Sequence, residues 1–137
     1  MSVIDHTILT AFSETPIYAD QLLRMYARRR RIMVIPAHSL MVAARYARPG
    51  TTGVLTELTG ALYQPVIRFV DLDAETALRV GTGVPSFKPS ADADDAELRW
   101  LSVAPVIWAA RHLEQRILTR SPWLYDGHDD LDVDRMP

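Results

Sequence analysis

The residue best placed to do chemistry in this sequence is Asp5, which stands directly after the first apolar run. Val3 and Ile4 have the character of a short buried strand, and Thr7 is a residue type that caps helices. Ligands of parallel α/β proteins bind outside the carboxyl ends of the strands, and Mg²⁺ prefers carboxylate oxygens. Phosphodiester hydrolysis with Mg²⁺ or Mn²⁺ needs several converging carboxylates. Function therefore depends on whether Asp5 has acidic neighbours or only caps the following helix.

Two histidines offer a second kind of chemistry. His6 and His38 each follow the tip of an expected strand, so they could approach one another at the same edge of a sheet. Two imidazoles placed in this way can serve as acid and base in metal-free phosphoryl chemistry. The alternative is that both histidines are exposed or hydrogen-bonded and have a structural role.

Four consecutive arginines, Arg28, Arg29, Arg30 and Arg31, offer a contact for RNA or an acidic partner. They follow an expected helix, where cations also offset the helix dipole in solvent. Successive residues of an extended segment point to opposite sides, so the four side chains cannot all form one patch. A nucleotide-binding regulator that uses these arginines is one functional hypothesis.

Charge is distributed unevenly along the chain. Residues 1–70 contain eight arginines and four acids, whereas residues 71–137 contain seven basic residues and thirteen acids. The first half can meet an anion, and the second half repels nucleic acid if it shares that face.

Composition excludes several classes of protein. The chain has no cysteine, which rules out disulfides and thiolate metal sites. No apolar run approaches the roughly 20 residues of a membrane span, so no membrane contact is expected. The first residues lack the charge pattern of a secretory signal, which favours a cytoplasmic location.

Short apolar runs alternate with helical patterns, which favours a parallel sheet covered by helices. Further strands are expected at 32–35, 66–70 and 117–118, with a weak edge strand near 131–133. Helices are expected at 8–12, 38–46, 52–58, 74–80 and 92–103. Another helix is expected to begin at residue 16, and its inner face is expected to consist of Ile17, Leu22, Leu23 and Tyr26. Residues 81–90 have the composition of a loop. Pro105 either kinks the late helix or begins a new one that reaches His112.

The expected fold class is α/β, a three-layer α/β/α arrangement with a central parallel sheet of about four to five short strands. The length of 137 residues predicts a single domain, which we place at residues 1–125. Residues 126–137 then form an acidic C-terminal tail, either mobile or docked on arginines of its own or a neighbouring chain.

The order of these elements resembles the PIN domain, the fold of many metal-dependent ribonucleases, including bacterial toxins of the VapC type. The resemblance covers nearly the whole chain and is carried by segments 3–7, 34–37, 70–77, 108–111 and 117–119. It implies a site in which three or four acids at the strand tips hold Mg²⁺ or Mn²⁺ and activate a water.

Most of the acids that this resemblance implies are absent. Asp5 matches the first, but Val42, Val103 and Ser121 stand at the positions of the other three. The resemblance therefore implies a vestigial metal ligand at Asp5 and no intact catalytic set. The crevice of such a protein would be lined by His6, Thr7, His38, Val42, Val103 and Ser121.

We therefore expect a bacterial PIN-like protein that has lost the nuclease site and acts through contacts with protein or RNA. No cofactor is expected. The implied partners are a second copy of the chain in a homodimer, a co-encoded protein, or RNA that is bound without cleavage. The alternative is an endoribonuclease of the toxin type, dependent on Mg²⁺ or Mn²⁺, with rearranged ligands.

Overall fold

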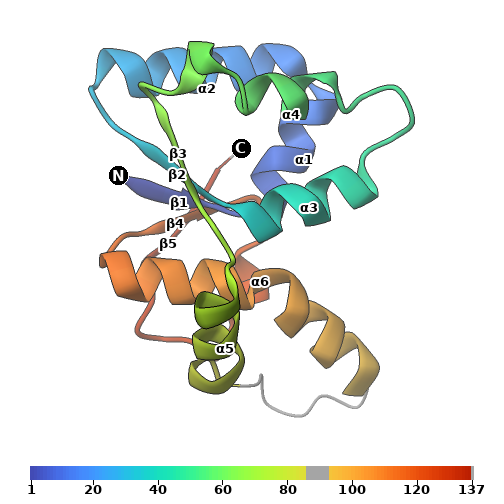
Figure 1. Cartoon of the computed structure of the whole chain (residues 1–137), viewed down its shortest axis with the longest axis vertical. Coiled ribbons are helices and arrows are strands. Elements are labelled where there is room, and N and C mark those ends of the chain that lie inside the picture. The colour runs from blue at the N-terminus through green and yellow to red at the C-terminus, as the bar shows by residue number, and fades with distance from the viewer. Residues whose placement is uncertain (86–92, 137) are drawn as a thin grey trace.

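The computed structural model describes residues 1–85 and 93–136 and confirms the predicted α/β class. One parallel sheet has the strand order β3-β2-β1-β4-β5. The strands are β1 Ser2–Ile4, β2 Met33–Pro36, β3 Ile67–Val70, β4 Ile117–Thr119 and β5 Val133–Arg135. Helices lie on both sides of this sheet, so the chain forms three layers (Figure 1).

Each face of the sheet has its own set of helices. One side carries α1 His6–Glu14, α2 Pro16–Arg28, α3 Ala37–Tyr46 and α4 Gly53–Leu58. The other side carries α5 Ala74–Gly83 and α6 Ala93–Leu113. Two short 3₁₀ turns, η1 Ala61–Tyr63 and η2 Pro122–Tyr125, complete the described elements.

The strands are continuous apolar runs because both of their faces are buried. Ile4 packs with α1 and α2, whereas its neighbour Val3 packs with α6. Leu118 and Ile117 divide between the two faces in the same way. This alternation is the period of two that a strand imposes on its side chains, and it builds one core on each face.

Several expected boundaries shift in the structure. The first helix begins at His6, two residues earlier than expected, and α5 continues through Gly83 into the segment expected as a loop. Ile17 is 70% exposed and does not lie on the inner face of α2, although Leu22, Leu23 and Tyr26 do. Residues 86–90 of the expected loop and the expected helix start at 92 lie outside the described residues.

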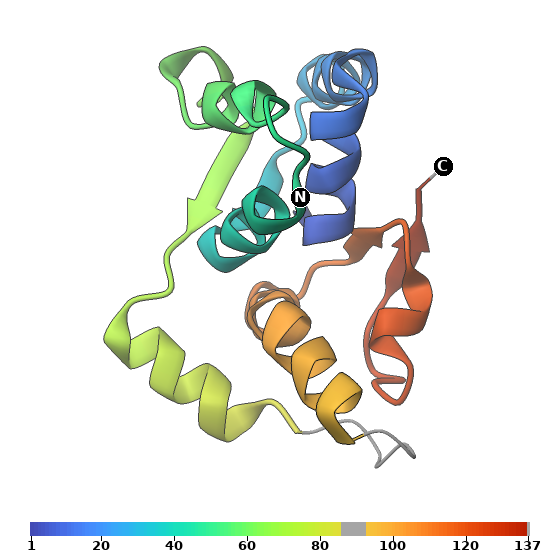
Figure 2. The same cartoon turned by 90° about the vertical axis from the view of Figure 1, so that its right-hand side faces the viewer.

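Pro105 lies inside α6, which continues as one helix from Ala93 to Leu113. The two halves of this helix run in different directions (Figures 1 and 2). A proline lacks the amide hydrogen that closes the helical turn and its ring crowds the preceding turn, which bends the helix. Of the two sequence-based alternatives, the structure therefore shows the kink.

Residues 126–136, expected as an acidic tail, belong to the same folded unit. They add the edge strand β5, and the amide of Ile117 donates to the carbonyl of Asp132 at 2.8 Å. Arg116 pairs with Asp134 at 2.6 Å, so the acids of this segment neutralise arginines of the domain. Among the described residues these acids pair with Arg116 and Arg111, and no ion pair joins them to the run at 28–31.

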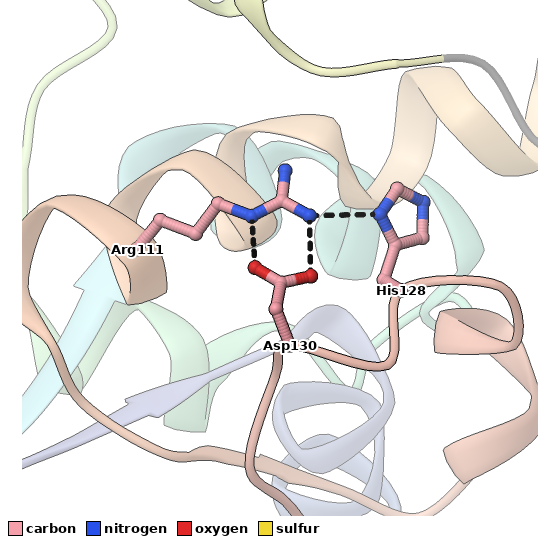
Figure 3. A network of polar contacts seen from close by, with 3 residues as sticks. All are labelled: Arg111, His128 and Asp130. Carbon is pink, nitrogen blue, oxygen red and sulfur yellow. Dashed lines mark hydrogen bonds and ion pairs between the residues drawn. The ribbon is translucent and has the colours of Figure 1, made fainter.

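The connection before β5 is held by a three-residue contact (Figure 3). Arg111 of α6 donates to both carboxylate oxygens of Asp130, at 2.7 and 2.8 Å. It also lies 3.1 Å from Nδ1 of His128, which must accept because a guanidinium can only donate. Burial lowers the pKa of His128, Arg111 and Arg99 lower it further, and Asp130 and Asp129 oppose them.

We expect the stability of the fold to decrease in mild acid because of His128. Its folded-state pKa lies below the ordinary value of 6.5, so the unfolded chain takes up the proton first as the pH decreases. The stabilisation from the neutral imidazole is therefore present above pH 6.5 and is lost as the pH decreases below it through the lowered folded-state pKa, which urea unfolding measures. His128→Gln should reduce this decrease without abolishing it, because burial also lowers the pKa of His6. A His128→Gln profile that follows the wild type at every pH would contradict this role.

Candidate functional site

The site expected from the sequence lies at the carboxyl edge of the sheet. The chain leaves β1 toward β2 on one side and returns to β4 on the other, so the strand order changes direction beside β1. Open α/β sheets bind ligands at such a point. Asp5 and Thr7 follow β1, and Thr119 and Ser121 end or follow β4, so these four residues meet there.

The carboxylate of Asp5 is fully buried and caps α1. Its Oδ1 accepts hydrogen bonds from the Thr7 amide at 3.0 Å, the Thr7 hydroxyl at 2.6 Å and the Ile8 amide at 3.4 Å. Its Oδ2 accepts from the hydroxyl of Tyr125 at 2.7 Å. Both oxygens of this carboxylate are therefore engaged by the protein, which confirms the capping alternative for Asp5.

Hydroxyl groups continue this network across to β4. The Thr7 hydroxyl donates to Asp5, so it accepts from the Thr119 hydroxyl at 3.1 Å and from the Arg120 amide at 2.9 Å. Thr119 in turn accepts from the Ser121 amide at 3.0 Å. The Ser121 amide donates to Thr119, Thr119 donates to Thr7, and Thr7 donates to Asp5. Because all three donate in the same direction, each hydrogen bond polarises and strengthens the next.

Tyr125 closes the network from the 3₁₀ turn η2. Burial raises the pKa of its phenol well above the ordinary value, and the adjacent charge of Asp5 and their hydrogen bond raise it further. The phenol therefore stays protonated and donates to Asp5 throughout the physiological range. No local sequence pattern links Tyr125 to Asp5, because 120 residues separate the two along the chain.

His6 and His38 lie close enough to interact electrostatically. Burial lowers the pKa of His6, Asp5 opposes that effect, and His38 lowers it further. The Nδ1 atom of His6 is buried and has no hydrogen-bond partner among residues 1–85 and 93–136. The prediction that the two rings approach each other is therefore supported, but no described contact joins them directly.

His38 has a structural partner that is explained by Pro105. Proline at position 105 cannot donate to the carbonyl four residues earlier, which belongs to Leu101. The Nε2 atom of His38 lies 2.5 Å from that carbonyl oxygen and so donates to it. The hydrogen bond ties α3 to the kink of α6, and it fixes the proton on Nε2 of His38.

The cavities at this edge have two different linings. One of about 550 Å³ is lined by His6, Thr7, Ser102, Ser121 and Trp123, among others. A neighbouring one of about 420 Å³ is more apolar and is lined mainly by His38, Met41, Val42, Tyr46, Leu98 and Leu101. Tyr46, Leu98 and Ser102 line both. We call the two together the carboxyl-edge crevice.

Val103 does not line this crevice. It has no exposed surface and packs in the core between the sheet and α6, whereas its neighbour Ser102 faces the crevice. The kink and register of α6 decide which of the two adjacent residues points outward, and the sequence pattern did not determine this. The other residues expected at the crevice, His6, Thr7, His38, Val42 and Ser121, all line it.

The four arginines of the run lie at the end of α2, at the amino edge of the sheet and away from the crevice. All four are exposed. Arg29 and Arg31 face a separate small cavity together with Arg116.

Within the described residues, no group of three or more histidine, aspartate or glutamate side chains is placed to share a metal ion. None of the helices in those same residues combines the length and the apolar character needed to cross a membrane.

No protein-family model matches this chain, and no curated protein matches it. Its function must therefore be inferred from the geometry of the crevice.

Asp5→Asn and Tyr125→Phe should each destabilise the protein. Asparagine keeps only one acceptor oxygen, so its NH2 group must face either the Thr7 donors or the Tyr125 hydroxyl, and phenylalanine leaves Oδ2 of Asp5 without a donor. Each change should lower the free energy of unfolding by about 1–3 kcal/mol, measured by urea denaturation. The double variant should cost less than the sum of the two, because both remove the same bond. An Asp5→Asn variant more stable than the wild type would indicate a metal ligand instead.

The bond between His38 and Leu101 should matter only while proline occupies position 105. His38→Ala should cost about 0.5–1.5 kcal/mol of unfolding free energy in the wild-type background. In a Pro105→Ala background the alanine amide can donate to the Leu101 carbonyl, so the same substitution should cost close to nothing. A double-mutant cycle measures this coupling and cancels the packing change at position 105. Equal costs in both backgrounds would contradict the assignment.

Proposed function

We propose that this protein is a catalytically inactive PIN-like binding protein whose carboxyl-edge crevice receives an apolar segment of a partner protein. The observation that carries the proposal is the state of Asp5, whose two carboxylate oxygens are both occupied by protein donors in a fully buried position. Mg²⁺ gives up its water ligands reluctantly and is not expected to compete for such a carboxylate.

The side chains around Asp5 support the same proposal. Val42 and Ser121 line the crevice at positions where the resemblance to the PIN domain implies acids, and Val103 is in the core. A two-metal mechanism needs several carboxylates at one point, and Thr7 and Thr119 offer only hydroxyls there. Asp95 also lines the crevice, but no three histidine, aspartate or glutamate side chains of the described residues are placed to share a metal ion.

The apolar part of the crevice indicates what it binds. Met41 and Tyr46 of α3 are 61% and 70% exposed, and Leu98 and Leu101 of α6 are 63% and 48% exposed. Single exposed apolar residues are ordinary, but several around one cavity mark a site of protein or ligand contact. Covering them gains about 25 cal/mol for each Å² of apolar surface removed from water.

The shape and charge of this surface favour one helix of a partner protein. The exposed residues lie on two helices with a cavity between them, which suits an amphipathic helix laid in a groove. Arg45 lines the same cavity and forms no ion pair with any residue in the described ranges. We therefore expect the partner helix to carry an acidic residue beside its apolar anchors, on a co-encoded protein.

Substitutions on the two helices should abolish partner binding. Leu98→Glu and Met41→Glu each place a charge in the apolar cavity. Either change should weaken binding of the co-encoded protein by tenfold or more, because loss of a buried apolar anchor costs about 1.4 kcal/mol or more, and roughly 1.4 kcal/mol corresponds to a tenfold change in affinity. Leu62→Glu is the matched control, because Leu62 is equally exposed or more so and lies on η1, outside the crevice. Affinity is measured with purified proteins, and light scattering shows whether a second copy occupies the surface instead. Equal affinities for Leu98→Glu and Leu62→Glu would contradict the proposal.

A nuclease assay tests the alternative. Purified protein with Mn²⁺ and RNA should give no cleavage that depends on Asp5. Cleavage by the wild type that Asp5→Asn abolishes, together with a melting temperature raised by Mn²⁺, would establish the ribonuclease of the toxin type.

A further inference from the structure

A second cavity lies at the amino edge of the sheet, at the opposite ends of the strands from the carboxyl-edge crevice. It has a volume of about 210 Å³ and is lined by Ser2, Met25, Tyr26, Arg29, Arg31, Arg116, Leu118, Asp134 and Met136. Ser2 begins β1, and Arg31 and Arg116 shortly precede β2 and β4. We call this cavity the amino-edge pocket.

The turn that ends α2 explains why only two of the four consecutive arginines reach this pocket. Arg30 has a φ of +51°, in the left-handed region, and its amide donates to the carbonyl of Ala27 at 3.1 Å. The amide of Arg31 donates to the carbonyl of Tyr26 at 2.9 Å. These two bonds form a Schellman motif, which reverses the chain at the helix end. Arg29 and Arg31 then line the pocket, and Arg28 and Arg30 do not.

A turn of the same kind at the end of α6 places a third arginine, Arg116, at the pocket. Glu114 has a φ of +53°, and the amide of Gln115 donates to the carbonyl of Ala110 at 3.0 Å. The chain then enters β4 through Arg116. Arg31 precedes β2 in the same way, and only β1 lies between β2 and β4 in the sheet, so both arginines line the same pocket. Two helix ends far apart in the sequence therefore place cations at one point.

Positive charge exceeds negative charge in the pocket. Arg116 pairs with Asp134 at 2.6 Å and lies 3.7 Å from Asp132. Arg29 and Arg31 form no ion pair with any residue in the part of the chain that the structure describes. Two guanidinium groups thus remain available to an anion.

The wall of the pocket combines buried hydroxyls with apolar side chains. Ser2 and Tyr26 are only 2% and 3% exposed, so their hydroxyl-bearing side chains form part of the wall of the pocket. Burial raises the pKa of Tyr26, whereas Arg31 and Arg116 lower it, so the charge of both arginines reaches this phenol. Met25 and Leu118 supply carbon surface to the same cavity.

We propose that the amino-edge pocket binds a phosphate monoester, whose phosphate oxygens are held by Arg29 and Arg31. Guanidinium groups match phosphate oxygens with paired charge-assisted hydrogen bonds. The volume corresponds to roughly seven water molecules, enough for one phosphate group and a few attached atoms. Met25 and Leu118 face the attached carbon atoms. The phosphate belongs either to a small free molecule or to the 5′ end of an RNA, and these two sources share the same chemistry at the pocket.

Calorimetric titration of the full chain tests this proposal at constant ionic strength. The probes are adenosine 5′-monophosphate with adenosine as its partner, and a short RNA with either a 5′-phosphate or a 5′-hydroxyl. The phosphorylated member of at least one pair should bind at least about tenfold more tightly than its unphosphorylated partner, because charge-assisted bonds are lost in the latter. Preference within the first pair identifies a free phosphate ester, and preference within the RNA pair alone identifies an RNA end.

The arginine run provides a control of equal charge. Arg29→Gln/Arg31→Gln should reduce the affinity for the phosphorylated probe about tenfold or more, whereas Arg28→Gln/Arg30→Gln should change it less than about threefold. All four side chains are exposed, so both variants are expected to fold, and their urea unfolding curves verify this. Equal losses in the two variants, or the absence of a preference for the phosphorylated member in both pairs, would show general attraction of anions and overturn the proposal. Failure of both phosphorylated probes and inorganic phosphate to bind would also overturn it.

Discussion

The buried carboxylate of Asp5 is the interaction on which the arrangement of the carboxyl edge depends. It caps α1 through the amides of Thr7 and Ile8 and accepts from the hydroxyl of Tyr125, which comes from the far end of the chain. A fully buried charge is stable only when donors surround it, so β1, α1 and η2 must all be in place for it to be accommodated. The network then extends through Thr7 and Thr119 to β4. The same residue that suggested metal chemistry therefore acts as a structural centre.

The shape of the carboxyl-edge crevice depends on Pro105, which has no amide hydrogen. Pro105 bends α6 and leaves the Leu101 carbonyl without its helical partner, and His38 supplies the replacement donor. The N-terminal half of α6 departs from the direction of its C-terminal half (Figure 2). Leu98 and Leu101 thus stand beside Met41 and Tyr46 with their apolar surface exposed, rather than packed against the sheet. A local backbone defect and one long-range hydrogen bond together create the surface for which we propose a partner.

The two edges of the sheet differ in chemistry because helices begin at one edge and end at the other. At the carboxyl edge the chain enters helices, and the side chains there cap amides and surround an apolar crevice. At the amino edge α2 and α6 end in left-handed turns at Arg30 and Glu114, and arginines follow both turns. Cations near helix ends offset the dipole, but their convergence with Tyr26 in one pocket comes from the parallel packing of β2 and β4 around β1. The acidic residues of the C-terminal segment offset part of that charge through Arg116.

The sequence by itself determined the class of fold and limited Asp5 to two roles, a helix cap or a metal ligand. Apolar runs buried on both faces, helical periodicity and a carboxylate two residues before a threonine are local patterns, and local patterns reflect the steric and capping preferences of a few neighbouring residues. It did not reveal Tyr125 as the partner of Asp5, the inward position of Val103 or the meeting of Arg29, Arg31 and Arg116. Each of these depends on where a distant segment returns and on the rotation of a helix about its axis. Only the packed tertiary structure decides those two quantities, because they follow from the shapes of all the side chains between the elements.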